Sequence, residues 1–171
     1  MSDNTKVLVR NAREQDIPTV AEINAEAFSA YGIAETSEAF QRRLTAFEDG
    51  FIILVAENEI AAYACSEKWL TQEQPVSGEG PTVTHHPEGR ILCITSLAVK
   101  TKFRGRGYGL LILDKMIEIA HREGCKQIII KTTHAQGLVQ KRGFKSMHGE
   151  GDAALDVMSL EIESYGSKAS N

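Results

Sequence analysis

Hydrophobic and polar residues recur along this chain with two periods, which together predict strands and helices in alternation. Residues 51–57 (FIILVAE) form a strongly apolar run, and residues 60–69 follow it after the polar pair Asn58-Glu59, so the two runs predict a β-hairpin. Runs or alternations of apolar residues predict further strands at residues 6–10, 91–99, 126–132 and 154–162, and another strand that begins at Phe144.

Apolar residues spaced three and four positions apart predict four helices between these strands. The first begins after Asp16, which is expected to cap it, and the second begins after Thr36 or Ser37. The third covers residues 110–123 and the fourth covers residues 135–142. Strands and helices in this order predict an α/β (α+β) fold in which helices cover both faces of the sheet.

The segment from residue 91 to residue 124 carries the strongest chemical signal. A strand leads into the loop Arg104-Gly105-Arg106-Gly107-Tyr108-Gly109, and a helix follows. The glycines let the backbone turn tightly, and the first amides of the helix point outward without intrahelical acceptors. Together with the helix dipole and two arginines, these amides predict a site for phosphate groups.

Two common phosphate-binding motifs do not match this loop. A Walker loop requires Lys-Ser or Lys-Thr after its last glycine, and neither pair follows here. A dinucleotide fingerprint, G-x-G-x-x-G, fits Gly105 and Gly107 but meets Leu110 where its last glycine belongs. What remains is Arg104-x-x-Gly107-x-Gly109 directly after a strand that ends Leu97-Ala98-Val99.

This pattern resembles the R/Q-x-x-G-x-G/A signature of the GNAT superfamily of acyl-CoA-dependent N-acetyltransferases. The flanking strand and helix and the downstream Arg142-Gly143-Phe144 extend the resemblance, which covers about residues 6–162. It implies a mixed, mostly antiparallel sheet of about seven strands flanked by about four helices, with strands four and five splayed apart. It also implies acetyl-CoA, or coenzyme A, as the cofactor. The run THHPEGRILCITSLAV and the following FRGRGYG look most like the arylalkylamine N-acetyltransferase branch.

The resemblance also implies where the coenzyme would bind. In the family, pantetheine lies between the splayed strands like an added strand, and the loop cradles the pyrophosphate. A backbone amide at residues 97–99 would donate to the acetyl carbonyl and stabilise the developing oxyanion. Carried over by position, the coenzyme-binding residues are Leu97, Ala98, Val99, Arg104, Gly105, Arg106, Gly107, Tyr108, Gly109, Leu110, Thr132, His134, Leu138 and Lys141.

The side chains that many family members use for proton transfer are missing. A Tyr usually stands four residues before the Gly-Phe pair, where this chain has Val139, and a Glu or His often stands on strand four, where it has Cys93 and Thr95. A thiolate leaves without strong acid help, but an alkylammonium with a pKa of about 10 must first lose a proton. The predicted catalytic residues are therefore His134, which follows strand five, and Thr95, which could orient a water molecule. Other candidates are His85, His86 and Glu67, with Tyr31 and Tyr63 as replacement acids.

Composition narrows the class of protein. A chain of 171 residues fits a single domain (1–171), with a core at about residues 6–162 and a frayed tail at residues 163–171. The net charge of −4 gives no basic footprint for nucleic acid, and no apolar run approaches the roughly 20 residues of a membrane span. The three cysteines and the pair His85-His86 lack metal-ligand spacing, so no metal is expected. The N-terminus has no signal-peptide pattern, and a cytoplasmic protein is expected.

Several functions are compatible with these features. The first is an N-acetyltransferase that moves an acetyl group directly from acetyl-CoA to a primary amine of a small molecule or peptide. The alternative is an acyl-CoA-binding module with little or no turnover, and a nucleotide-binding protein is a third possibility. The acceptor is open, although acidic residues on the first two helices would suit a cationic amine, and a monomer or a homodimer is expected. The long loop at residues 72–90 is either solvated or a lid over the acceptor.

Overall fold

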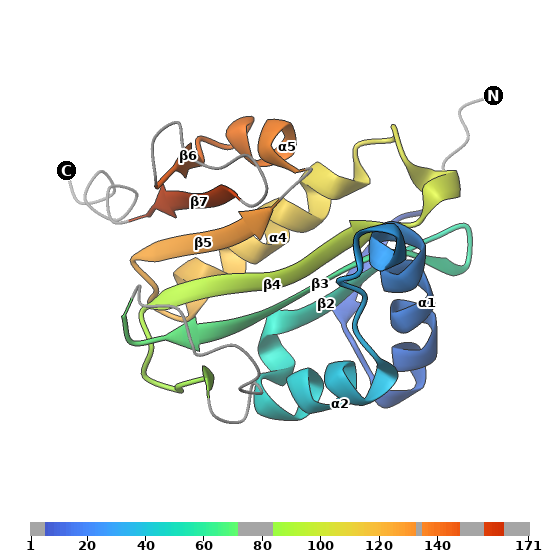
Figure 1. The fold of residues 1–171 in the computed structure, drawn as a ribbon, viewed down its shortest axis with the longest axis horizontal. Coiled ribbons are helices and arrows are strands. Elements are labelled where there is room, and N and C mark those ends of the chain that lie inside the picture. Colours follow the sequence, from blue (N-terminus) through green and yellow to red (C-terminus); the bar gives the residue numbers. More distant parts are fainter. Residues whose placement is uncertain (1–5, 72–83, 133–134, 148–155, 163–171) are drawn as a thin grey trace.

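The computed structural model describes residues 6–71, 84–132, 135–147 and 156–162, which build a seven-stranded sheet with helices on both faces (Figure 1). The strand order is β1-β2-β3-β4-β5-β7-β6, and neighbours are antiparallel except for the parallel pair β4 and β5. The strands are β1 (Leu8–Asn11), β2 (Phe51–Ala56), β3 (Glu59–Trp69), β4 (Ile91–Val99), β5 (Gln127–Thr132), β6 (Lys145–Ser146) and β7 (Asp156–Glu161). The expected mixed, mostly antiparallel sheet is confirmed.

The helices form two layers, as the sequence predicts. On one face lie α1 (Ile17–Phe28) and α2 (Ser37–Ala46), and on the other lie α4 (Tyr108–Arg122) and α5 (Gln136–Gln140) (Figure 1). The first face is closed by the buried side chains of Val20, Ile23, Phe40, Ile53, Tyr63 and Ala98. The second is closed by Ile112, Leu113, Met116, Leu92, Ile94 and Ile130. The apolar stripes read from the sequence are thus the surfaces that hold the layers together.

Two helix starts are decided by capping. The Thr36 hydroxyl accepts a hydrogen bond of 3.2 Å from the Ala39 amide, so Thr36 rather than Ser37 caps α2. The α4 helix begins at Tyr108, two residues before the predicted start, because Gly107 takes the N-cap position with a φ of +84°. The glycine loop therefore ends directly in the first turn of α4.

The prediction that Asp16 caps α1 is wrong. Asp16 already has helical backbone angles (φ −82°, ψ −20°), so its side chain does not reach forward to the first amides of α1. Instead, its carboxylate accepts hydrogen bonds of 2.8 and 3.0 Å from the Arg10 guanidinium and one of 2.8 Å from the Arg13 amide. The residue thus ties the end of β1 to the turn before α1.

We expect the substitution Asp16→Asn to lower the free energy of unfolding by about 1–3 kcal/mol at pH 7, because it removes a buried charge-assisted pair. Burial opposes ionisation of this carboxyl, but the hydrogen bonds from Arg10 and the Arg13 amide outweigh burial and lower its pKa. The wild-type advantage is therefore complete above the unfolded pKa of about 4 and is lost as the pH falls towards the lowered pKa of the folded state. Urea unfolding at pH 7 and at pH 3 measures both effects.

The matched control for this prediction is Glu14→Gln, which changes an exposed carboxylate in the same turn. Its effect should stay within about 0.5 kcal/mol at both pH values. If the Asp16→Asn variant loses the same free energy of unfolding at pH 7 and at pH 3, the assigned role of the carboxylate charge is contradicted.

The sheet opens between β4 and β5. In the described part of the chain, β5 pairs with β4 only from Ile91 to Ile94, whereas β4 continues to Val99. The second half of β4 keeps its pairing with β3 on its other edge. Its backbone groups on the β5 side therefore face a gap, and the expected splay between strands four and five is confirmed.

A β-bulge lies at the start of this gap. Cys65 on β3 pairs with Ser96, and the next residue, Ser66, pairs with Ile94, so Thr95 is an extra residue on β4. A bulge of one residue shifts the alternation of side chains along the strand. As a result Ser96 faces α1 instead of α4, although it stands two residues after Ile94, which faces α4.

No helix within the described residues is long and apolar enough to cross a membrane. Within these ranges, no three side chains of His, Cys, Asp or Glu gather in a way that could hold a metal ion. Cys65, Cys93 and Cys125 are buried free thiols.

Candidate functional site

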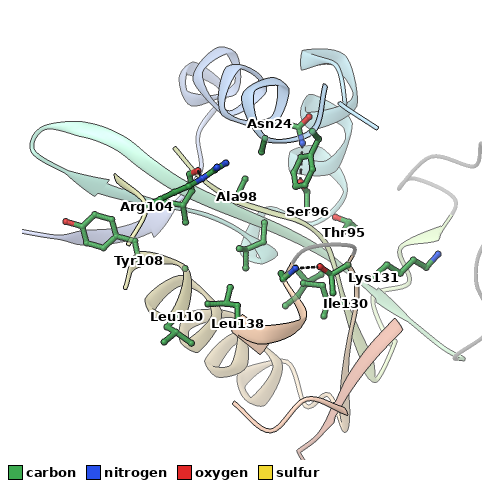
Figure 2. A pocket seen from close by; sticks show the side chains of 18 of the residues that line it. Asn24, Thr95, Ser96, Ala98, Arg104, Tyr108, Leu110, Ile130, Lys131 and Leu138 are labelled. Atoms are coloured by element: carbon green, nitrogen blue, oxygen red, sulfur yellow. Dashed lines mark hydrogen bonds between the residues drawn. The ribbon is translucent and has the colours of Figure 1, made fainter. Parts of the chain in front are cut away.

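A cavity of about 890 Å³ lies at the opening between β4 and β5 (Figure 2). Its walls are the second half of β4, the glycine loop with the start of α4, the end of β5 with α5, and the segment from α1 to residue 35. Its volume falls within the range of about 300–1,000 Å³ that is typical of ligand pockets. Segments from both helical layers and from the sheet centre thus meet around one space.

The glycine loop forms one end of the cavity. Gly105 and Gly107 have φ values of +80° and +84°, and a side chain at either position would meet nothing within 4 Å. Their need for glycine is therefore conformational and not steric. No side chain caps α4, whose first helical hydrogen bond runs from the Leu111 amide to the Gly107 carbonyl. The amides of residues 108–110 precede that bond, and this is the arrangement in which a helix start binds an anion.

A third glycine serves the packing of α5. A Cβ atom at Gly109 would stand 3.3 Å from Leu138 Cδ2 and 3.7 Å from Val99 Cγ2, so the missing side chain lets α5 approach α4 closely. Leu138 and Leu110 then face the cavity from the α4 side (Figure 2). Val139, at the position of the usual Tyr, is fully buried in the core and contributes no group to the cavity.

Most of the predicted coenzyme-binding residues come together here. The cavity lining includes Leu97, Ala98, Val99, Arg104, Gly105, Gly107, Tyr108, Gly109, Leu110, Thr132, Leu138 and Lys141. Arg106 is placed elsewhere, because its guanidinium pairs with Glu57 at 2.8 Å and lies over the Phe103 ring. His134 lies outside the described residues, as do residues 72–83 of the long loop. These assignments remain predictions, since position alone does not test binding.

Thr95, the other predicted catalytic residue, lines the cavity at the bulge. Its hydroxyl donates a hydrogen bond of 3.2 Å to the Cys65 carbonyl and lies 3.4 Å from the Cys65 sulfur. Across the gap, the Thr132 hydroxyl accepts a bond of 2.6 Å from the Ala135 amide and so shapes the turn into α5. Both hydroxyls therefore have structural partners at the cavity wall.

A buried hydrogen-bond network on the α1 side was missed from the sequence. The Asn24 side chain donates to the Tyr63 hydroxyl at 2.8 Å and to the Ser96 hydroxyl at 3.3 Å, and these two hydroxyls are 2.6 Å apart (Figure 2). The side-chain carbonyl oxygen of Asn24 accepts a hydrogen bond of 2.7 Å from the backbone amide of Glu35. Burial raises the pKa of the Tyr63 hydroxyl far above its usual value, so this hydroxyl stays protonated. The network ties the segment after α1 to β4.

A charged network adjoins this segment. Glu35 lines the cavity, and its carboxylate forms a bidentate pair with Arg43 of α2, with distances of 3.0 and 2.5 Å. The same guanidinium lies 3.9 Å from the buried Glu67, which also accepts hydrogen bonds from Trp69 and Thr84. Two carboxylates thus share one cation on this side of the sheet. The sequence pointed to Glu67 as a proton-transfer candidate and to acidic residues on the first two helices, but not to their shared partner Arg43.

His85, another proton-transfer candidate, has structural partners. His85 stacks on Phe47 with a centroid distance of 4.8 Å, and its Nδ1 accepts from the Lys68 amide at 3.0 Å. Burial and the nearby Lys68 charge lower the pKa of His85, which favours the neutral ring. Burial raises the pKa of the Cys65 thiol to about 12 and also raises the pKa of the Cys93 thiol. Neither thiol is therefore a thiolate nucleophile at neutral pH.

Comparisons with known proteins agree with this geometry. Thialysine N-epsilon-acetyltransferase of Bos taurus is 24% identical over 88% of this chain and 96% of its own length. Probable glucosamine 6-phosphate N-acetyltransferase 2 of Oryza sativa subsp. japonica is 30% identical over 67% of this chain and 86% of its own length. N-acetylglutamate synthase from Neisseria gonorrhoeae, solved with coenzyme A and N-acetyl-glutamate, shares the fold with a TM-score of 0.68 and 16% identity over 94% of this chain and 36% of that chain. The sequence profile of the Acetyltransferase (GNAT) family matches residues 17–144. The chain therefore belongs to the GNAT acetyltransferase family.

Proposed function

We propose that this protein is an acetyl-CoA-dependent N-acetyltransferase that moves an acetyl group directly to the primary amine of a small molecule or peptide. The observation that carries this proposal is the half of β4 without a β5 partner, which runs into a glycine loop and an uncapped helix start. The two curated relatives act, by their names, on amino groups of small molecules. Membership of the acetyltransferase family supports the same class of reaction.

The site residues fit an acyl-coenzyme. The amides at the start of α4 and the Arg104 guanidinium suit the negatively charged pyrophosphate. The free edge of β4 at residues 95–99 offers backbone donors and acceptors to the amides of pantetheine, in the manner of an added strand. Leu110 and Leu138 would cover the apolar parts of the arm. In this arrangement the thioester lies near the bulge at Thr95.

The reaction needs no covalent enzyme intermediate. The free amine attacks the thioester carbonyl carbon, a C–N bond forms, and the C–S bond breaks to release the coenzyme thiolate, which takes up one proton. A backbone amide at residues 97–99 would stabilise the oxyanion. The buried thiols argue against an acyl-cysteine route, because burial favours their protonated forms. We assign deprotonation of the ammonium to ordered water, with Thr95 and His134 as the side chains proposed to hold it.

The test is thiol release from acetyl-CoA with a panel of amines and a no-amine control, alongside calorimetric binding of acetyl-CoA. We expect saturable binding of acetyl-CoA and release that depends on at least one amine, with one acetamide formed per thiol. Failure of acetyl-CoA to bind would contradict the assignment of the glycine loop. Mass spectrometry should detect no acetylated protein during turnover, and a stable acetyl-protein would contradict direct transfer.

One observation favours a second candidate, a module that binds acyl-CoA with little turnover. The position of the usual Tyr is Val139, which faces the core and offers no proton. Tight binding of acetyl-CoA without release for any amine would establish this reading. We place the enzyme first because a thiolate leaves readily without an acid.

A further inference from the structure

Lys131 is a cavity residue that the coenzyme does not explain. Along β5, Ile130 packs towards α4, so the next side chain, Lys131, points to the opposite face of the sheet. Figure 2 shows its stem leaving β5 on the side away from α4 and Leu138. Ile129, which alternation puts on the same face as Lys131, pairs with the buried Cys93 of β4. This is the face on which α1 and α2 lie.

The ammonium is too far along the sheet to serve the pyrophosphate. Ile130 pairs with Ile94, so Lys131 stands level with Thr95, where the thioester is proposed to lie. The glycine loop begins only after the end of β4 at Val99, four residues further on, which is about 13 Å at 3.3 Å per residue. Arg104 and Lys131 accordingly lie at opposite ends of the cavity (Figure 2).

Lys131 has no ion-pair partner among the carboxylates that the structure describes. Two carboxylates on this side of the sheet have other partners, since Glu35 is held by Arg43, and Glu67 interacts with Arg43, Trp69 and Thr84. The residue is only partly exposed. A cation in this position, beside an attacking amine, repels an ammonium but attracts an anion.

We propose that Lys131 binds an anionic group of the acceptor, so that the preferred substrate is a primary amine that also carries a carboxylate or a phosphate. Because Lys131 and the free edge of β4 lie on strands that have separated, the anion and the amine stand roughly one to two strand spacings apart, about 5–10 Å. A chain of about five carbons between the two groups spans this distance. This inference rests on the proposed acetyltransferase function and deepens it.

The test compares acceptors that differ only in the anionic group. Lysine and cadaverine differ by a carboxylate, and 5-aminopentyl phosphate and 5-aminopentanol differ by a phosphate. We expect the wild type to favour one anionic member over its neutral or cationic match by at least about tenfold in kcat/KM. The larger of the two ratios identifies the anion as carboxylate or phosphate.

Variants assign the preference to the side chain. In Lys131→Met, kcat/KM for the anionic acceptor should fall about tenfold, mostly through KM, while the matched amine changes less than about twofold and the acetyl-CoA Kd is unchanged. Lys131→Arg should restore part of the preference. Lys115→Met, on the exposed face of α4 where Lys115 pairs with Glu118, is the control and should behave as the wild type.

Three results would overturn the proposal: a wild-type preference for cadaverine and aminopentanol, an equal loss for both members of a pair in Lys131→Met, or a weaker acetyl-CoA Kd in that variant. The last result would move Lys131 into the coenzyme site. If acetyl-CoA binds but no amine releases thiol, the proposed function fails instead. Calorimetric titration of the same acceptor pairs into the complex with coenzyme A then tests whether Lys131 binds the anionic group. If the anionic and the matched acceptor bind equally, or if neither binds detectably, the proposed role of Lys131 is overturned.

Discussion

Replacement of Gly107 by valine is expected to weaken acetyl-CoA binding by at least about 100-fold while the protein remains folded. Gly107 has a φ of +84° at the N-cap of α4, a backbone conformation that a β-branched residue disfavours by about 1–2 kcal/mol or more. The loop can relieve this strain only by rotating out of its conformation. The amides of residues 108–110 would then lose their common direction towards the pyrophosphate. Calorimetric titration with acetyl-CoA measures the loss.

The chain supplies a matched control at the other end of the same helix. Gly124 follows α4 with a φ of +72°, and, as at Gly107, a side chain there would meet nothing within 4 Å. Gly124→Val should therefore cost similar stability, because both substitutions strain the backbone in the same way. Thermal unfolding should show comparable losses, but only Gly107→Val should lose the coenzyme. Equal acetyl-CoA affinity in the two variants would show that the glycine loop is not the phosphate site.

The substitution Asn24→Leu is expected to raise KM for the amine about tenfold and to lower the free energy of unfolding by about 2–3 kcal/mol. It keeps the size of the side chain but removes the hydrogen bonds to Tyr63, Ser96 and the Glu35 amide. The segment that carries Glu35 then loses its tie to β4. Because the coenzyme side of the cavity is untouched, KM for acetyl-CoA should change less than about twofold.

Tyr63→Phe separates this positioning role from a general loss of stability. The variant removes one hydroxyl from the same network but leaves Asn24 bonded to Ser96 and to the Glu35 amide. It should cost about 1–2 kcal/mol of stability while KM for the amine stays near the wild-type value. If the two variants raise this KM equally, the tie between Asn24 and Glu35 does not position the acceptor side.

Much of the proposed coenzyme side of the cavity could be predicted from the sequence because its signals are local. A glycine at positive φ, a helix start and the strand before it occupy consecutive residues, so their geometry follows from the order of residue types. The same holds for the apolar stripe of α4 and for the Thr36 cap. The prediction that Asp16 caps α1 was wrong because its carboxylate is bound by Arg10 of β1. The residue pattern at the start of a helix does not include that partner.

The proposed acceptor side of the cavity could not be predicted in this way, because its residues are far apart in the chain. Asn24 reaches Ser96 across 72 positions, and Arg43 of α2 approaches Glu67 of β3. The bulge at Thr95 adds a second difficulty, since it reverses the facing of Ser96 relative to simple alternation. No local pattern points to Lys131, which only the strand register places level with Thr95.

By itself, the sequence determined the fold class, the family and the loop that is proposed to bind phosphate, because hydrophobic periodicity and the conformational freedom of glycine are properties of neighbouring residues. The tertiary structure alone decided where the parallel pairing of β4 and β5 ends, which way Ser96 points, and which charged residues line the cavity. Those features depend on strand register and on contacts between α1, α2 and the sheet. Such contacts arise only when segments distant in the chain pack together, so no local pattern contains them.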